Sequence, residues 1–246
     1  MKQSVVQLFV TCLVDSLFPS VGESTIAILE GQGLTVEFPF DQTCCGQPAF
    51  NAGFQKEAKS MARHIVEVLH DTQGPIISPS GSCAEMLTHH GPELLANDPD
   101  IAPKAREVAS RVRELTAFLV NDLGITNVGA RVEEQRAAYH SSCHGLRGLG
   151  IDDEPRQLLQ QVEGLEFAEL PEAETCCGFG GIFSIEMPEI STAMLDSKIE
   201  NLMSTGADVL VGGDVGCLMH IEGGLRRRGI AIQVAHIATI LRKGNG

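Results

Sequence analysis

The tetrapeptide Thr43-Cys44-Cys45-Gly46 returns later in the chain as Thr175-Cys176-Cys177-Gly178. In each copy, one further cysteine lies more than thirty residues before the pair and another lies more than thirty residues after it. The eight cysteines of this 246-residue chain thus form two sets of four with matching spacing: Cys12, Cys44, Cys45 and Cys83, then Cys143, Cys176, Cys177 and Cys217. A repeat of this length indicates a duplicated domain rather than a solenoid unit.

The duplication extends past the cysteines and divides the chain into two halves. Residues 112–119 align with residues 234–241 in their apolar pattern. We expect one cysteine-rich domain at residues 1–125 and a second at residues 136–246. The polar stretch at residues 125–135 is the expected seam between them.

Short apolar runs alternate with helical patterns in both halves. The runs are typical of buried strands and lie at residues 5–11, 34–40, 74–79, 136–142, 165–170 and 209–212. Apolar residues at helical spacing predict helices at residues 54–69 and 195–206. The alternation predicts an α/β fold of two pseudo-symmetric βαβ-type halves, each Rossmann-like with a parallel sheet.

Each cysteine position follows a predicted strand, and ligands of open parallel sheets bind just outside the carboxyl ends of the strands. We therefore expect the four cysteines of each half to meet at one edge of its sheet. Cys83 and Cys217 are expected to open helices, whose N-termini lower the pKa of a thiol. Gly46 and Gly178 are expected to take the tight or left-handed turns that aim two adjacent sulfurs at one centre.

Clustered thiolates in this pattern favour a metal or redox cofactor. Thiolates are the usual ligands of iron–sulfur clusters, so all eight cysteines are candidate cofactor-binding and metal-binding residues. Four thiolates also suit zinc, which stays open as an alternative for at least one half. A third reading is a thiol enzyme or sensor whose adjacent cysteine pairs cycle through disulfides.

The overall charge excludes some classes of partner. The chain has 18 lysines and arginines against 32 aspartates and glutamates, a net charge of −14, which disfavours nucleic acids and anionic membranes. No apolar run is long enough to span a bilayer. Residues 5–14 lack a signal-peptide cleavage site, so we expect a cytoplasmic protein, where patterned cysteines more often bind metal than form disulfides.

Both cysteine sets resemble the cysteine-rich CCG domain, which occurs in heterodisulfide reductase, in anaerobic glycerol-3-phosphate dehydrogenase and in the iron–sulfur component of glycolate oxidase. With two such domains and no ferredoxin segment, the chain resembles the bacterial lactate utilisation protein A family. The segments that carry this likeness are residues 11–15, 40–48, 80–83, 176–181 and 213–220.

The resemblance implies a part in the oxidation of L-lactate to pyruvate, within an oxidoreductase system. It also implies companion lactate-utilisation proteins, one of them a ferredoxin-type iron–sulfur protein, with this chain relaying electrons.

The chain departs from the heterodisulfide reductase motif, which ends in Cys-x-x-Cys. Ser80 and Asp214 stand at the first of those two positions. Four cysteines in each half are enough for one [4Fe–4S] cluster, which would give two clusters per chain. The two-part cluster that needs five thiolates is not expected here. Ser80 or Asp214 would then supply an oxygen ligand or a nearby hydrogen bond.

Three histidines lie close to the cysteines in sequence. His144 and His220 are either proton relays or ligands, or side chains that pack and donate hydrogen bonds, and we expect the second. His140 lies on a predicted strand and is expected to be a hydrogen-bonded core or edge residue.

Overall fold

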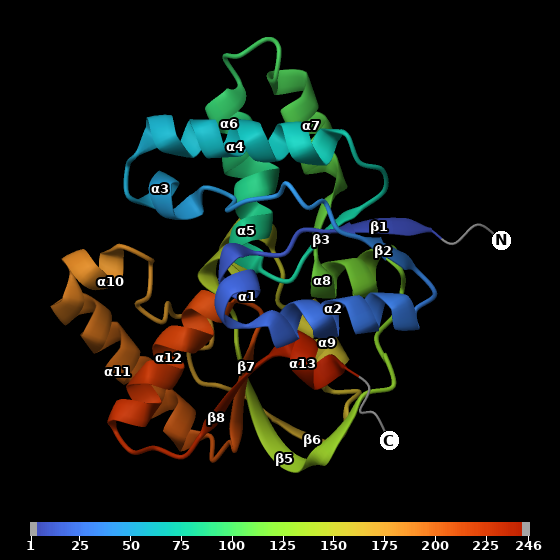
Figure 1. Cartoon of the computed structure of the whole chain (residues 1–246). Helices are drawn as coiled ribbons and strands as arrows, with labels where there is room; N and C mark the ends of the chain where they lie inside the picture. Colours follow the sequence, from blue (N-terminus) through green and yellow to red (C-terminus); the bar gives the residue numbers. More distant parts are fainter. Residues whose placement is uncertain (1–3, 243–246) are drawn as a thin grey trace.

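A computed structural model describes residues 4–242. Its strands form two four-stranded parallel sheets, ordered β2-β1-β3-β4 and β6-β5-β7-β8 (Figure 1). The first sheet consists of β1 (Val5–Leu8), β2 (Thr35–Glu37), β3 (Ile76–Ser78) and β4 (Val112–Glu114). The second consists of β5 (Arg131–His140), β6 (Glu163–Ala168), β7 (Val209–Gly212) and β8 (Gln233–His236). The predicted α/β fold with two similar parallel-sheet halves is confirmed.

Helices connect the strands in both halves. The first half contains α1 (Cys12–Leu17), α2 (Pro19–Gly31), α3 (Gln47–Asn51), α4 (Gln55–His70), α5 (Gly81–Glu85), α6 (Gly91–Leu95), α7 (Ala102–Arg111) and α8 (Leu115–Ala117), with π-helical turns η1 (Met86–His90) and η2 (Phe118–Asp122). The second contains η3 (His144–Gly148), α9 (Asp153–Leu159), α10 (Phe183–Glu186), α11 (Pro188–Ser204), α12 (Val215–Arg227) and α13 (Ile237–Leu241). Among the described residues, no helix has both the length and the apolar character needed to cross a membrane.

The predicted elements are found, with shifted bounds. The helix expected at residues 54–69 is α4, which buries its apolar stripe and exposes its charges. The helix expected at residues 195–206 starts earlier, because Pro188 fits the first turn of α11, where its missing N–H has no partner to lose. Strand β5 also starts earlier, at Arg131, inside the stretch expected to be a seam.

Each sheet has a fourth strand that the apolar pattern did not predict, β4 in the first and β8 in the second. These strands have three and four residues, and charged or polar side chains interrupt their apolar character. They pair with β3 and β7, and so extend each sheet by one strand.

The two halves pack against each other through a shared apolar core. One cluster of buried side chains combines Val21 and Ile28 of α2 with Ile237 and Leu241 of α13. Helices α2 and α13 lie side by side (Figure 1). Burying one such aliphatic side chain stabilises a protein by about 1.5–3 kcal/mol, so the halves support one another's folding.

His236 joins the two halves by a buried hydrogen bond. Its Nε2 donates to the Pro79 carbonyl at 3.0 Å, and its Nδ1 accepts from the Ala238 backbone N–H at 3.1 Å. This pattern requires a neutral ring with its proton on Nε2. Burial lowers the pKa of His236 from 6.5 to about 4.

We expect acid to destabilise the protein through His236. Between pH 6.5 and pH 4 the unfolded chain binds a proton at this residue and the folded chain does not, so stability falls as the pH falls. The loss from pH 7 to pH 5 is about 2 kcal/mol by proton linkage. Urea unfolding at both pH values measures it. His236→Gln is expected to lose that part of the pH dependence, whereas the exposed control His89→Gln keeps it. Equal pH dependence in the two variants would contradict this assignment.

Candidate metal centres

The cysteines of the first half meet where strands of its sheet end. Cys12 opens α1 after β1, and Cys83 is the third residue of α5 after β3. Cys44 and Cys45 lie in the loop that leads to α3. Six residues, 38–43, separate this pair from β2, so the pair does not follow its strand directly as predicted. The loop carries it back to the shared edge.

The four sulfurs of the first half are close but not bonded. The Sγ atoms of Cys12 and Cys44 are 3.6 Å apart, and those of Cys45 and Cys83 are 3.4 Å apart. A disulfide needs about 2.05 Å, and all eight cysteines are free thiols. Cys12 is exposed whereas Cys45 and Cys83 are buried, so this cluster of thiols reaches from the interior to the surface.

The second half repeats the arrangement. Cys143 precedes η3, the adjacent pair precedes α10, and Cys217 is the third residue of α12. The Cys176 thiol interacts with those of Cys143 and Cys177, and the Cys177 thiol with that of Cys217. The geometry thus brings together all four predicted cysteines in each half. Cys83 and Cys217 lie in the first turns of their helices, as predicted.

Of the two predicted alternatives, the glycines that follow the cysteine pairs have the left-handed backbone. The φ angle is 92° at Gly46 and 88° at Gly178. A Cβ atom on Gly178 would lie 2.5 Å from the Ser191 carbonyl oxygen, so only glycine fits there without strain. The Gly178 N–H also donates to the Cys176 sulfur at 3.4 Å. The turn therefore both shapes the cysteine pair and stabilises a thiolate within it.

The thiols of each site shift one another's pKa. The pKa of Cys44 is lowered to about 3, first because Cys12 donates a hydrogen bond to its thiolate. The pKa of Cys176 is lowered to about 2 by the matching interaction with Cys143. Four other thiols have a raised pKa, first because each shares its hydrogen with such a thiolate: Cys12, Cys45, Cys143 and Cys177. Within each site, the interaction between neighbouring thiols thus favours ionisation of the first cysteine of the adjacent pair, Cys44 or Cys176.

This donor set fits a bound metal or metal cluster. Thiolates are the form that ligates metal, and a bound cation allows neighbouring thiols to ionise together. In each half, interactions between neighbouring thiols link the four cysteines, and backbone N–H groups such as that of Gly178 lie beside them. The residues present thus suit a cationic, thiolate-bound cofactor in each half.

Asp214 forms hydrogen bonds that connect the halves, and Ser80 caps a helix within the first half. The Asp214 carboxylate accepts from the Ser82 N–H at 2.9 Å and from the Ser82 hydroxyl at 3.1 Å. The Ser80 hydroxyl accepts from the Cys83 N–H at 3.4 Å and caps α5. Both carboxylate oxygens are thus engaged by Ser82, so this geometry favours the hydrogen-bonding alternative over an oxygen ligand.

Two of the nearby histidines have hydrogen-bond partners, as expected. The His144 ring pairs with the Glu85 carboxylate across the two halves. The Nε2 atom of His220 lies 3.4 Å from the Ser191 hydroxyl.

His140 differs from its expectation of a hydrogen-bonded residue. It is 1% exposed, yet neither ring nitrogen has a hydrogen-bond partner of normal geometry within residues 4–242, although the Ala173 carbonyl lies close enough to favour a protonated ring slightly. The ring lies beside the second site: a His140 nitrogen and the sulfurs of Cys177 and Cys217 are all within 4.8 Å of one another. The sequence did not predict this placement of the ring, because the side chain of a strand residue can point either into the core or toward the site at the strand end.

Lys198 also lies near the second site, and this was not predicted from the sequence. Lys198 is 1% exposed, and its ammonium donates to the carbonyls of Glu172 at 2.6 Å and Ala173 at 3.2 Å. Burial lowers its pKa, and the nearby Cys177 opposes that shift. The sequence feature that could have identified it is the position of a lysine on the apolar face of a predicted helix, between Leu195 and Leu202.

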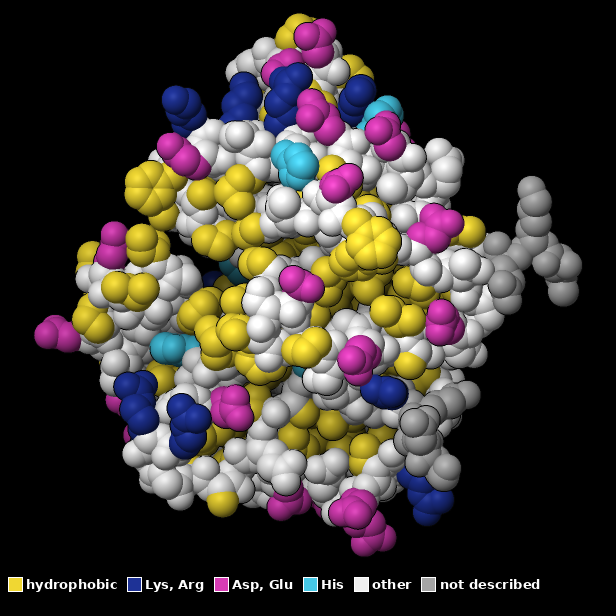
Figure 2. Space-filling model, viewed as in Figure 1, with side chains coloured by type: hydrophobic (Ala, Val, Ile, Leu, Met, Phe, Trp, Pro, Cys, Tyr) yellow, Lys and Arg dark blue, Asp and Glu magenta, His cyan; other side chains and the backbone are white. Residues whose placement is uncertain are grey.

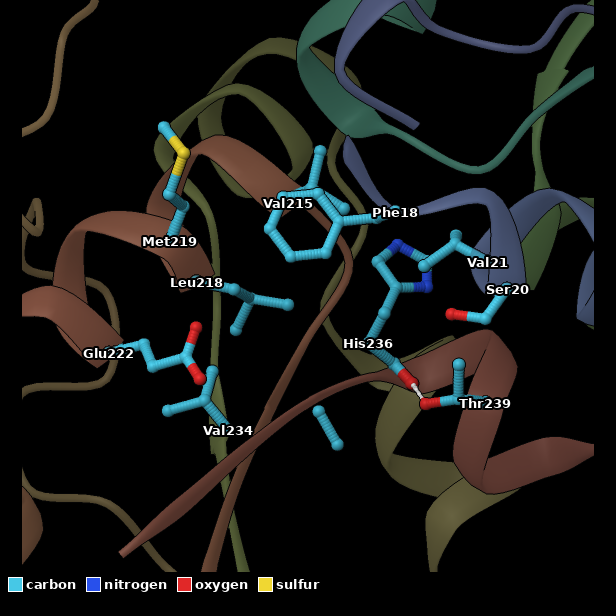
Figure 3. Close-up of a pocket in the computed structure, with 11 residues that line it drawn as sticks. Phe18, Ser20, Val21, Val215, Leu218, Met219, Glu222, Val234, His236 and Thr239 are labelled. Atoms are coloured by element: carbon cyan, nitrogen blue, oxygen red, sulfur yellow. Dashed lines mark hydrogen bonds between the residues drawn. The ribbon is translucent and has the colours of Figure 1, made fainter. Parts of the chain in front are cut away.

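A cavity of about 170 Å³ lies apart from both sets of cysteines (Figure 3). It is bordered by α2, α12 and β8, with Phe18, Leu218 and Val234 among its apolar lining and Glu222 as its acidic group. No cysteine lines it. The cavity is therefore separate from the candidate metal centres.

Hydrophobic side chains are also exposed beside a hollow on one face of the molecule. Figure 2 shows a hollow between the α3–α4 region and the α10–α11 region, with hydrophobic side chains along its border. Phe54, at the start of α4, and Ile185, in α10, are 56% and 77% exposed.

Comparisons with known proteins agree with the two-site geometry. The model of the CCG cysteine-rich domain family matches twice, at residues 6–88 and 137–222. A lactate utilization protein A from Exiguobacterium sp. is 47% identical over 97% of both chains. A protein of the same name from Shouchella clausii is 48% identical over 96% of this chain and 98% of its own.

Among solved structures, a hypothetical protein from Helicobacter pylori shares the fold, with a TM-score of 0.68 and 14% identity. It aligns with 99% of this chain, which spans about half the length of that protein (49%). The repeated family match and the full-length similarity lead to one conclusion: the chain belongs to the CCG cysteine-rich domain family and, within it, to the lactate utilization protein A family.

Proposed function

We propose that this protein holds one [4Fe–4S] cluster in each half and relays electrons during the oxidation of L-lactate to pyruvate. The observation that carries the proposal is the meeting of four free thiols at the strand ends of each half. The proposed ligands are all eight cysteines, from proposed domains at residues 1–125 and 136–246. When bound, such a cluster accepts and releases one electron at a time.

The lactate role is supported by the names of the relatives. L-lactate becomes pyruvate by losing two electrons and two protons, so the reaction needs an electron acceptor. We propose that a companion ferredoxin-type iron–sulfur protein exchanges electrons with this chain, in the reducing cytoplasm where thiols stay free. The exposure of Cys12 supports such an exchange, because it places one edge of the first centre at the surface.

The protein's own groups have defined parts in this proposal. The turns at Gly46 and Gly178 position the paired sulfurs, and the Gly178 N–H supports the Cys176 thiolate. Asp214 and Ser82 hold the second half against the helix that carries Cys83. These contacts fix the two centres relative to each other.

A zinc scaffold is the second candidate, favoured by the sulfur spacing. With Zn–S bonds of about 2.3 Å, the sulfurs of a tetrahedral site are roughly 3.8 Å apart. Two sulfur pairs of the first half, at 3.6 and 3.4 Å, are close to that spacing. A zinc protein of this kind would assemble an oxidoreductase without carrying electrons.

Growth on L-lactate tests the role in the cell. In a bacterium that uses a family member for this growth, the gene of that family member is deleted and the strain is complemented with the gene for this chain. We expect the wild type to restore growth on L-lactate, and the variants Cys45→Ser and Cys177→Ser to fail. Growth on pyruvate is the control and is expected to be equal in all strains. If wild-type protein accumulates but growth on L-lactate does not return, the lactate assignment is wrong.

A further inference from the structure

The two candidate centres differ at a position that the repeat makes equivalent, the last residue of β5 in one half and the residue just after β1 in the other. His140 lies three residues before Cys143, and Phe9 lies three residues before Cys12. Both side chains are buried, at 1% and 0% exposure. One half therefore places an imidazole where the other places a hydrocarbon ring.

The imidazole lies beside the second centre, and the Ala173 carbonyl is its other polar neighbour. Within the described part of the chain, both nitrogens of His140 lack a hydrogen-bond partner of normal geometry. One lies within 4.8 Å of the sulfurs of Cys177 and Cys217. A buried polar group left unpaired destabilises the folded protein. Contact with a metal centre at those two sulfurs would remove this cost.

A second pair of equivalent positions differs in the same sense. A Cβ on Gly178 would lie 3.1 Å from the Met194 Cβ, and one on Gly46 would lie 3.3 Å from the Met61 Cβ. The two methionines are therefore equivalent. One helical turn later, four residues on, α11 has Lys198 and α4 has Ile65.

These two residues are equally buried but differ in charge. Lys198 is 1% exposed and Ile65 is 0% exposed. The lysine ammonium is held by the carbonyls of Glu172 and Ala173, a few residues before the Cys176–Cys177 pair, and interacts electrostatically with both thiols. The second centre thus has a buried cation where the first has an aliphatic side chain.

We propose that His140 and Lys198 give the cluster of the second half a higher reduction potential than that of the first half. The imidazole nitrogen contacts the centre beside Cys177 and Cys217, and the ammonium offsets the negative charge of the thiolate-bound cluster. Hydrogen bonding, ligand type and net charge determine the reduction potential of an iron–sulfur cluster. Phe9 and Ile65 supply none of them. An electron added to the protein therefore resides mainly in the second half. This inference rests on the proposed function.

The test measures each cluster alone. The Cys177→Ser protein keeps the first cluster, and the Cys45→Ser protein keeps the second. Anaerobic redox titration of both, followed by EPR, is expected to show at least a tenfold preference of the electron for the second cluster, equivalent to about 59 mV for one electron. Added to the Cys45→Ser protein, His140→Phe and Lys198→Ile copy the first half and are each expected to lower the potential. The exposed control His89→Gln leaves it unchanged.

A further measurement needs no change at His140. Pulsed EPR of the reduced Cys45→Ser protein is expected to show a coupling to an imidazole nitrogen that is stronger than any in the Cys177→Ser protein. Equal potentials in the two single-cluster proteins, or equal nitrogen couplings, would overturn the inference and leave the proposed function intact. A wild-type protein without any reducible cluster would instead defeat the proposed function itself.

Discussion

Replacing Cys177 by serine is expected to remove about half of the iron bound by the protein and to leave the first centre filled. Cys177 is 1% exposed and interacts with Cys176 and Cys217, so it lies inside the thiol cluster rather than at its edge. Serine keeps the size of the side chain but supplies a hydroxyl, which is a much poorer ligand for iron than a thiolate. The loss should therefore come from ligation and not from packing.

Cys45→Ser is the matched variant in the first half. Cys45 is 3% exposed, and its sulfur lies 3.4 Å from that of Cys83. Iron analysis and the visible absorption of anaerobic protein are expected to fall by about half in each single variant, and almost completely in the double variant. Unchanged iron content in both single variants would show that the ligand assignment is wrong.

Gly178→Ala is expected to destabilise the protein by about 3 kcal/mol and to empty the second centre. An alanine in the left-handed region costs about 1–2 kcal/mol, and overpacking in a tight environment adds about 1–3 kcal/mol. The new methyl group would lie 2.5 Å from the Ser191 carbonyl oxygen. That segment cannot move freely, because the Ser191 hydroxyl donates to the Gly178 carbonyl at 2.7 Å.

Gly181→Ala is the control for the backbone term alone. Gly181 also has a positive φ, 64°, but a Cβ there would meet no atom within 4 Å. We expect it to cost about 1–2 kcal/mol and to keep the iron of the second half. Urea unfolding and iron analysis of the two variants separate the terms. If the two substitutions have the same effect, close packing around Gly178 does not shape the centre.

The sequence was sufficient to predict the architecture because the same pattern of cysteines, strands and helices occurs twice in the chain. Matching cysteine registers identified the duplication, and strand–helix alternation in each half led to parallel sheets. Strands β4 and β8 escaped prediction because three or four residues with charged or polar members show no clear period. The early start of β5 at Arg131 has a similar cause, since this strand enters through exposed charged residues before its buried end.

The cysteines of the candidate site were predictable because side chains at the ends of parallel strands converge. His140 and Lys198 were not, because a single histidine on a strand or a single lysine on a helix does not reveal its direction. Only the folded chain shows that both are buried beside one centre. The internal repeat already aligns Phe9 with His140. The difference between these residues can be interpreted only once both positions are known to be buried.

The most direct test of this account is the metal content of protein purified without oxygen. Iron, acid-labile sulfide and zinc are measured per chain, together with the visible absorption spectrum. We predict about eight irons and eight sulfides per chain, the content of two thiolate-bound [4Fe–4S] clusters. About two zinc ions per chain with no sulfide would contradict it, and the protein would then be a structural scaffold.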